Sequence, residues 1–339
     1  MINQRYRLID TKNIRIDFVE EEISEEKVIV KPTYMSICAA DQRYYQGLRP
    51  RHIMQKKLPL ALIHEAVGEV LYDPKGEFTT GTKVVLIPND PKESNSVVKE
   101  NYLRSSKFMG SSEDGFMQGV VVINRENLVD IDGVKPTTAS LLELISVSMN
   151  AIENFEKINN TKKDVIGVWG DGSVGYVTSL VLKYIYPKSK IIVLGKKVQK
   201  LDFFSFADEI YTVDSLPTDL VIDQAFECVG GSHSDLAINQ IIDVIAPQGT
   251  ISLLGVSEEN VPINTRMVLE KGLTLVGNSR SGRQDFINAI NLLRENPEIS
   301  VYLEAVISDN IKVTSVNDIH TAFSKDMDNE FKTVMEWLI

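Results

Sequence analysis

The spacing of hydrophobic positions changes near Thr138, and the change separates two kinds of segment. Before it, short apolar runs are broken by Gly, Pro and Asp, which is typical of strands joined by turns. Strands are predicted over residues 28–30, 67–72, 83–87 and 117–123. The polar segment 88–114 is expected to form a loop or surface lobe. The first third of the chain is therefore predicted to be β-rich.

After Thr138, strands and helices are predicted to alternate. Apolar residues recur at spacings of three and four from Leu142 to Ile152, which indicates a helix. The buried strands are predicted over 165–169, 191–194, 220–226, 251–254 and 273–276, and further helices follow residue 173 and cover 285–294. This order predicts an α/β fold with a doubly wound parallel sheet. We expect residues 1–143 and 281–339 to form a β-rich catalytic domain and residues 144–280 an inserted dinucleotide-binding domain.

Composition narrows the function classes. A chain of 339 residues favours two domains. It has 36 basic and 47 acidic residues, a net charge of −11 and a pI near 5.0, so we expect it to repel nucleic acid and anionic membranes. Two cysteines form no disulfide framework, and no secretory signal or bilayer-spanning run is found, so a reducing cytoplasm is expected. An anionic substrate would need a local basic pocket.

A glycine-rich run follows the strand predicted over 165–169 and opens a helix. Gly170 would permit a tight turn, Gly172 the close approach of a pyrophosphate, and Gly175 tight packing of helix on strand. Ser173 and Val174 begin the helix, whose free N–H groups would face the phosphates. A plain strand–turn–helix corner is the alternative, but the context predicts a dinucleotide site.

The end of the second predicted strand bears on cofactor choice. Enzymes that bind NAD usually carry an acid there for the ribose hydroxyls, whereas this chain has Lys196 and Lys197, with Lys200 nearby. Lysines would neutralise a 2′-phosphate, so the sequence favours NADP(H). A solvated pair of surface lysines is the alternative.

Cys38, His64 and Glu65 offer a thiolate, an imidazole and a carboxylate, which are donors that catalytic zinc accepts. Asp41 would hydrogen-bond the second imidazole nitrogen of His64 and fix its tautomer. Taken singly, these residues are more often a small buried cysteine, a satisfied core histidine and a turn or cap aspartate. Glu143, by default a solvent-facing helix residue, would be a fourth ligand or the partner of a zinc-bound water.

The phrases that carry this chemistry resemble the zinc-dependent branch of the medium-chain dehydrogenase/reductase superfamily over essentially the whole chain. They are residues 36–41, 63–65, 142–147, 226–231 and 277–280. The resemblance implies a Rossmann domain, a GroES-like catalytic domain, one catalytic zinc and a homodimer. It leaves open whether Glu65 or Glu143 ligates zinc directly.

Three departures from the family pattern affect these expectations. The segment 88–114 holds no cysteine, so the four-cysteine structural zinc lobe is absent and any metal is catalytic. Ala40 stands where many relatives carry Ser or Thr as a proton relay, so zinc-bound water would act with Glu143, Glu65, Tyr44 or Tyr45. Ala39 replaces a Gly or Arg, which is sterically harmless.

Within the superfamily, residues 36–45, 169–172 and 254–257 are similar to the ribulose-5-phosphate reductases of wall teichoic acid synthesis. This resemblance implies NADPH-dependent reduction of D-ribulose 5-phosphate to D-ribitol 5-phosphate, which a cytidylyltransferase then activates. The rival interpretations are a zinc polyol or alcohol dehydrogenase with an unphosphorylated substrate, and a non-catalytic nucleotide-binding module.

A basic segment after Cys38 is a candidate phosphate site, because Arg binds phosphate bidentately. Its residues are Arg43, Arg49, Arg51, His52, Lys56 and Lys57. A solvated basic loop is an equal alternative. Arg280 and Arg283 are a second candidate pair.

Overall fold

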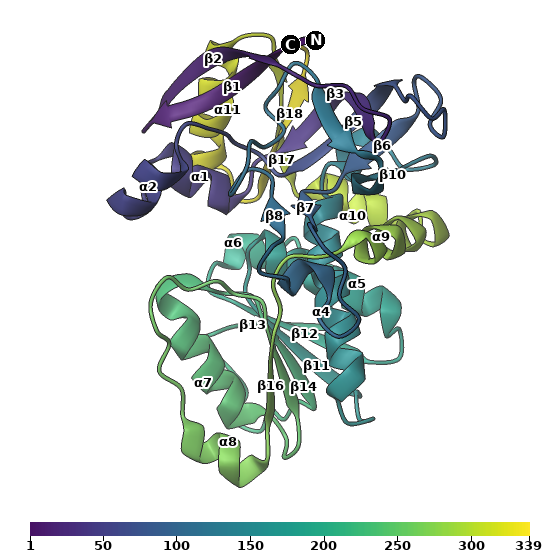
Figure 1. Cartoon of the computed structure of the whole chain (residues 1–339). Coiled ribbons are helices and arrows are strands. Elements are labelled where there is room, and N and C mark those ends of the chain that lie inside the picture. The colour runs from purple at the N-terminus through teal and green to yellow at the C-terminus, as the bar shows by residue number, and fades with distance from the viewer. The chain divides into compact units, whose positions relative to one another are not determined.

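The computed structural model describes residues 1–339, which divide into two compact units. One unit combines residues 1–146 with residues 281–339, and the other consists of residues 147–280. The first boundary between the units falls within helix α4 (Leu142–Ile158), between residues 146 and 147. It lies slightly C-terminal to the boundary predicted between residues 143 and 144. Figure 1 shows the strands and helices of each unit.

The split unit is built mainly from strands. They are β1 (Ile2–Asp10), β2 (Asn13–Glu20), β3 (Lys27–Ser36), β4 (Leu60–Ala61), β5 (Glu65–Tyr72), β6 (Lys83–Leu86), β7 (Asn89–Asp90), β8 (Lys107–Phe108), β9 (Val121–Asn124), β10 (Leu128–Asp130), β17 (Ile307–Val313) and β18 (Lys332–Trp337). The largest sheet has the order β10-β6-β5-β3-β18-β17, with β9 also paired to β3. Strands β2-β1-β4 form a second sheet, and β7 pairs with β8.

Helices and 3₁₀ turns complete this unit. They are α1 (Ala39–Tyr45), α2 (Arg51–Lys57), α3 (Pro136–Ala139), α9 (Arg283–Glu295), α10 (Ile299–Ala305), α11 (Val316–Asp328) and the 3₁₀ turns Glu100–Tyr102 and Arg125–Asn127. The core beneath them combines residues from both ends of the chain, including Leu8, Met35, Phe116, Phe323 and Trp337. Burying such large apolar side chains is the main source of the unit's stability.

The C-terminal segment extends one end of the sheet that the N-terminal segment forms. Strand β18 pairs antiparallel with β3, with Val334 opposite Ser36 and Glu336 opposite Tyr34, and β17 pairs parallel with β18. Strand β3 also pairs with β5 on its other side. The register therefore brings the start of β18 close to the end of β3.

The continuous unit is a parallel six-stranded sheet in the order β13-β12-β11-β14-β15-β16. Its strands are β11 (Val165–Trp169), β12 (Lys190–Gly195), β13 (Glu209–Thr212), β14 (Gln224–Glu227), β15 (Thr250–Leu253) and β16 (Thr274–Gly277). The connecting helices are α5 (Ser173–Ile185), α6 (Val198–Leu201), the 3₁₀ turn Gly231–His233, α7 (Ser234–Val244) and α8 (Thr265–Lys271). The predicted fold class, a doubly wound parallel sheet with a β-rich second part, is confirmed.

Several element boundaries differ from the predicted ones. The antiparallel β1–β2 hairpin was not predicted, because charged residues interrupt its apolar positions. The strand predicted over 220–226 begins at Gln224, since Val221 is 61% exposed and only a single bridge forms at Ile222. The segment 88–114 contains the short strands β7 and β8 and one 3₁₀ turn. None of the helices combines the length and the apolar character needed to span a bilayer.

Candidate active site

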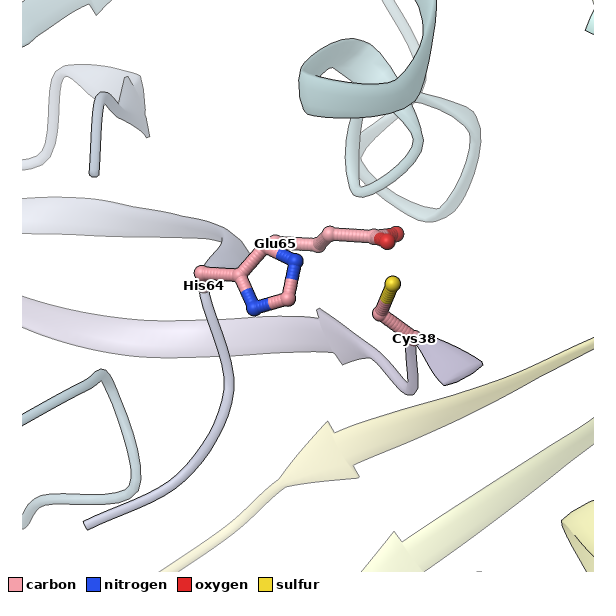
Figure 2. A group of neighbouring side chains, drawn as sticks. All are labelled: Cys38, His64 and Glu65. Carbon is pink, nitrogen blue, oxygen red and sulfur yellow. The ribbon is translucent and has the colours of Figure 1, made fainter. Parts of the chain in front are cut away.

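Three candidate metal ligands meet where β3 ends and β5 begins. Cys38 is the N-cap of α1, two residues after β3, and Glu65 is the first residue of β5, directly after His64. Because Ser36 of β3 pairs with Glu65, the sheet register brings Cys38 and His64 together. Their donor atoms all lie within 4.8 Å of one another. Figure 2 shows the three side chains extending toward one another from these two segments.

The donor set and its burial fit a zinc ion. His64 and Glu65 are buried, and Cys38 is half-buried. The Oε2 atom of Glu65 is buried without a hydrogen-bond partner, although buried carboxylate oxygens are nearly always paired. A thiolate, an imidazole and an unpaired carboxylate oxygen leave one position open for water or substrate in a tetrahedral site.

Asp41 is fully buried and fixes both ligand segments. Its Oδ2 accepts a hydrogen bond from the backbone N–H of Cys38 at 3.1 Å, and its Oδ1 accepts one from the backbone N–H of Ile63 at 3.1 Å. The same Oδ1 lies 3.4 Å from Nδ1 of His64. Asp41 therefore lies within ion-pair distance of the imidazole, although Nδ1 of His64 makes no hydrogen bond.

The charges around His64 favour its protonated form when no metal is bound. Burial lowers the pKa of His64, but the charges of Asp41 and Cys38 outweigh that effect and hold it well above its ordinary value. A metal ion must displace this proton from the imidazole. Metal binding is consequently expected to release protons.

Lys332 is a buried charge that the sequence interpretation missed. Its Nζ donates to the carbonyl oxygen of Ile37 at 2.8 Å and to Oε1 of Glu65 at 2.8 Å, so it joins the two ligand segments. Burial lowers its pKa, but Glu65 and Cys38 raise it more, and the lysine stays charged. The available signal was a single lysine between Phe331 and the apolar residues of β18.

Ile63 adopts a left-handed backbone conformation directly before His64, with φ of 70°. This conformation is costly for a β-branched residue and is usually left to glycine. Ile63 stands where the His-Glu phrase of the superfamily carries glycine. The backbone there is held by the bond to Asp41 and by the N–H of Phe116, which donates to the Ile63 carbonyl at 2.8 Å. The turn sets the direction in which His64 leaves the backbone.

Glu143 lies in the first turn of α4 and is buried rather than solvent-facing. Burial raises its pKa to about 7, with His64 and Lys332 opposing the rise and Glu65 adding to it. It is not among the residues whose donor atoms lie within 4.8 Å of one another. Glu143 is therefore a neighbour of the three-ligand cluster.

The glycine run at the start of α5 is shaped for a close ligand approach. Gly170 has φ of +130°, and a Cβ on Gly175 would lie 1.9 Å from the Gly170 carbonyl oxygen. A Cβ on Gly172 would meet nothing within 4 Å, so this face is open. Ser173 and Val174 are partly exposed at the N-terminus of the helix. Free N–H groups at this end suit a pyrophosphate.

A hollow of about 540 Å³ lies beside this run, at the carboxyl ends of β11 and β12. We call it the nucleotide hollow; it is lined by Gly170, Asp171, Gly172, Leu194, Gly195, Lys196, Val213, Asp214, Cys228, Val229, His233, Leu236, Ala237 and Gln240. Of the predicted lysines, Lys196 lines it, whereas Lys197 and Lys200 do not. Lys196 and Lys197 are exposed.

The candidate phosphate residues are spread over two helices. Arg43 lies on α1, and Arg51 begins α2. The guanidinium of Arg49 lies 5.1 Å from the centre of the Tyr44 ring. Of these, Arg43 is on the helix that Cys38 caps.

The second arginine pair and the tyrosines have other contacts. Arg283 donates to the carbonyls of Glu126 and Leu128 at 2.6 Å each, which is a structural role, and Arg280 belongs to the other unit. The hydroxyl of Tyr45 lies 2.6 Å from Nδ1 of His320. The Tyr45 hydroxyl is thus hydrogen-bonded to a histidine of α11, outside the ligand cluster.

Comparison with known proteins places these features in a family context. Residues 24–133 match the model of the alcohol dehydrogenase GroES-like domain, and residues 137–337 match that of the glucose dehydrogenase C-terminus. Over the full length of both chains, the sequence is 47% identical to a ribulose-5-phosphate reductase of Bacillus spizizenii. It is 44% identical to one of Streptococcus pneumoniae, over 99% of this chain and 98% of that protein.

A solved structure agrees with the sequence comparison. The crystal structure of Staphylococcus aureus TarJ in complex with NADPH superposes with a TM-score of 0.89 and 43% identity, covering all of both chains. The predicted resemblance is confirmed. The ligand set and the glycine run described above therefore lie in a chain similar to its relatives from end to end.

The buried ion pair of Lys332 and Glu65 predicts that the cost of removing the lysine depends on whether zinc is bound. Lys332→Met should destabilise the metal-free protein by about 3 kcal/mol, because it leaves a buried carboxylate unpaired. The loss should be much smaller with zinc bound, since the ion supplies a positive charge to Glu65. Urea unfolding with and without zinc measures both values.

Lys325→Met, at an exposed lysine of α11, is the matched control and should change neither value. Lys332→Arg keeps the charge and should recover part of the stability. Equal destabilisation with and without zinc would show that Glu65 is not a zinc ligand.

Proposed function

The chain belongs to the ribulose-5-phosphate reductase family of medium-chain zinc dehydrogenases, and from this premise we propose that it reduces D-ribulose 5-phosphate to D-ribitol 5-phosphate with NADPH. The observation that carries the proposal is 47% identity over the full length to a reductase of that name. The product would be a substrate for a cytidylyltransferase and so supply CDP-ribitol for teichoic acid. A reducing cytoplasm, which keeps the Cys38 thiol available as a ligand, is the proposed location.

Zinc is the proposed metal, held by Cys38, His64 and Glu65. Bound there, it would polarise the C2 ketone and stabilise the alkoxide that hydride transfer from NADPH creates. Asp41 lies 3.4 Å from the imidazole and would orient it once a metal draws the ring into place. Lys332 holds one oxygen of Glu65 while the other stays available. The short distances within the cluster favour Glu65 over Glu143 as the direct ligand.

The proton that completes the alcohol has no hydroxyl relay at residue 40, where the chain has alanine. Glu143 is the buried acid beside the ligand cluster, and we propose that it acts on the zinc-bound water rather than on the metal. A carboxyl group whose proton is held near neutral pH suits this transfer.

NADPH is the proposed cofactor because the end of β12 carries lysines and no acid side chain of its own. Lys196 lines the nucleotide hollow, where a cation would neutralise a 2′-phosphate. The related Staphylococcus aureus structure is described as a complex with NADPH. The glycine run supplies the pyrophosphate cradle for either dinucleotide.

For the substrate phosphate, Arg43 is the favoured residue. It lies on α1, which begins at the ligand Cys38, and guanidinium groups bind phosphate bidentately. Arg49 and Arg51 follow within the same basic segment. A protein of net charge −11 needs such a local cluster to attract an anionic substrate.

The substrate is tested by following NADPH oxidation with a panel of ketoses, each with and without its phosphate. We expect D-ribulose 5-phosphate to have the highest kcat/KM. In the same assay, Cys38→Ser should lose zinc and at least about a hundredfold in rate, because the metal no longer stabilises the alkoxide. Cys228→Ser, at the second cysteine, should retain zinc.

Equal rates with D-ribulose would instead favour a zinc polyol dehydrogenase with an unphosphorylated substrate. Full activity and zinc content in Cys38→Ser would exclude the proposed metal site. Stoichiometric zinc without turnover of any ketose would favour a non-catalytic nucleotide-binding protein.

The phosphate assignment has a separate test. Arg43→Ala should raise KM for D-ribulose 5-phosphate by about tenfold or more, which is the effect of losing charge-assisted hydrogen bonds to a phosphate. Its kcat/KM for unphosphorylated D-ribulose should stay unchanged. Arg15→Ala, at an exposed arginine of β2, is the control. Equal losses on both substrates would contradict the assignment.

We also propose that the chain is a homodimer, as its family resemblance implies. Strand β16 lies at the end of the parallel sheet and has a free outer edge, with Leu275 and Val276 half-buried. Such an edge pairs readily with a second copy. Sedimentation analysis should give twice the mass of one 38.0 kDa chain, and a monomer at micromolar concentration would contradict this.

A further inference from the structure

The carboxylate of Asp171 lies at the corner where a dinucleotide's adenosine half is expected. In a doubly wound sheet, the nucleotide crosses the carboxyl edge beside the first strand, and the adenosine half lies toward the second. Here these strands are β11 and β12, and the nucleotide hollow opens beside their ends. Asp171 follows β11 and lines that hollow together with Gly195 and Lys196.

Asp171 holds the backbone that follows β12. Its Oδ2 accepts hydrogen bonds from the backbone N–H groups of Lys196 and Lys197, each at 2.7 Å. The charge of this oxygen is therefore compensated by two backbone dipoles. Bonds from N–H groups to an ionised carboxylate are stronger than those between neutral groups. The turn that carries both lysines is thus fixed from the neighbouring strand.

The shape of the corner supports the same role. A Cβ on Gly195 would lie 2.6 Å from Cβ of Asp171 and 3.0 Å from its Oδ2. Any larger residue at 195 would push the carboxylate away from the two N–H groups. The residue directly before the turn is also tied to the neighbouring segment, because the N–H of Val213 donates to the Gly195 carbonyl at 2.9 Å. The backbone at residues 195–197 is consequently packed against and hydrogen-bonded to the side chain of Asp171.

We propose that Asp171 is a positioning residue for the adenosine 2′-phosphate: it fixes the turn after β12 so that Lys196 meets that phosphate in the nucleotide hollow. This inference rests on the proposed use of NADPH. It explains why Asp171, an acid, lies in the part of the nucleotide hollow that must accept the negatively charged 2′-phosphate. The two N–H groups occupy Oδ2, so only Oδ1 of Asp171 keeps its full capacity to accept bonds from ribose hydroxyls.

A direct contact between Asp171 and the cofactor would change the affinities for NADPH and NADH in the opposite direction. If its carboxylate bound the ribose hydroxyls, NADH would depend on it more than NADPH, because the 2′-hydroxyl of NADPH is esterified. If its charge alone mattered, removing it would strengthen the binding of a phosphate. Only a positioning role predicts that removing a negative charge weakens NADPH specifically.

The test measures dissociation constants for NADPH and NADH by calorimetry on the zinc-loaded protein, without substrate. Asp171→Ala should weaken NADPH by about tenfold, the loss expected for one or two charge-assisted hydrogen bonds, and NADH much less. Adenosine 2′,5′-bisphosphate should lose affinity in parallel with NADPH, and AMP should not. Asp171→Asn keeps an acceptor oxygen, so its dissociation constant for NADPH should lie between those of the unaltered protein and of Asp171→Ala.

Asp219→Ala is the control, since Asp219 is an exposed acid of the same unit that does not line the hollow. It should leave the preference for NADPH unchanged. Combining Asp171→Ala with Lys196→Ala should cost less than the sum of the two single losses, because both act on one contact.

Equal weakening of NADPH and NADH in both Asp171 variants would overturn the inference, as would a stronger effect on NADH. Unchanged binding of both cofactors would overturn it as well. If the unaltered protein itself prefers NADH, the proposed cofactor is wrong, which is a different result from an unaffected preference in the variants.

Discussion

The ion pair between Lys332 and Glu65 is the interaction on which the candidate active site depends. Both groups are buried, and neither charge would be tolerated there alone. The lysine also binds the carbonyl before Cys38, so one ammonium group fixes both segments that carry metal ligands. Asp41 does the same from the other side through the N–H groups of Cys38 and Ile63. The ligands are thus placed by buried charges, and a bound metal would complete an arrangement that the protein already holds.

In the nucleotide-binding unit, a buried or partly buried carboxylate likewise fixes a loop by accepting hydrogen bonds from backbone N–H groups. Asp171 joins the first strand to the turn after the second, as Asp41 joins α1 to the segment before β5. In each case a carboxylate accepts two backbone N–H groups, which is stronger than two neutral bonds and leaves the loop little freedom. Because these loops are already ordered, less conformational entropy is lost from the protein when a ligand binds to them.

The sequence predicted the parallel sheet and the glycine run that opens a helix, because each has a local pattern. It also singled out Cys38, His64 and Glu65, which the structure brings together, and left Glu143 open as a further candidate ligand. Lys332 could not be found in this way, since its partner is distant in sequence and only the β3–β18 register brings them together. The burial of Glu143 was also hidden, because one residue beside an apolar stripe can face either way. Asp171 lay within a recognised motif, yet its role depends on the absence of a side chain at Gly195. Patterns along the chain report local structure, whereas these roles arise from contacts between segments.

The place of β18 in the chain has a consequence for biosynthesis. Cys38, His64 and Glu65 are made before the nucleotide unit, and Lys332 only after it. While the ribosome is still adding that unit, β3 lacks its β18 neighbour and Glu65 lacks its buried cation. The two clamps on the ligand segments therefore differ in when they can form, because Asp41 lies among the first residues made and Lys332 among the last. The complete arrangement exists only once β18 has paired with β3.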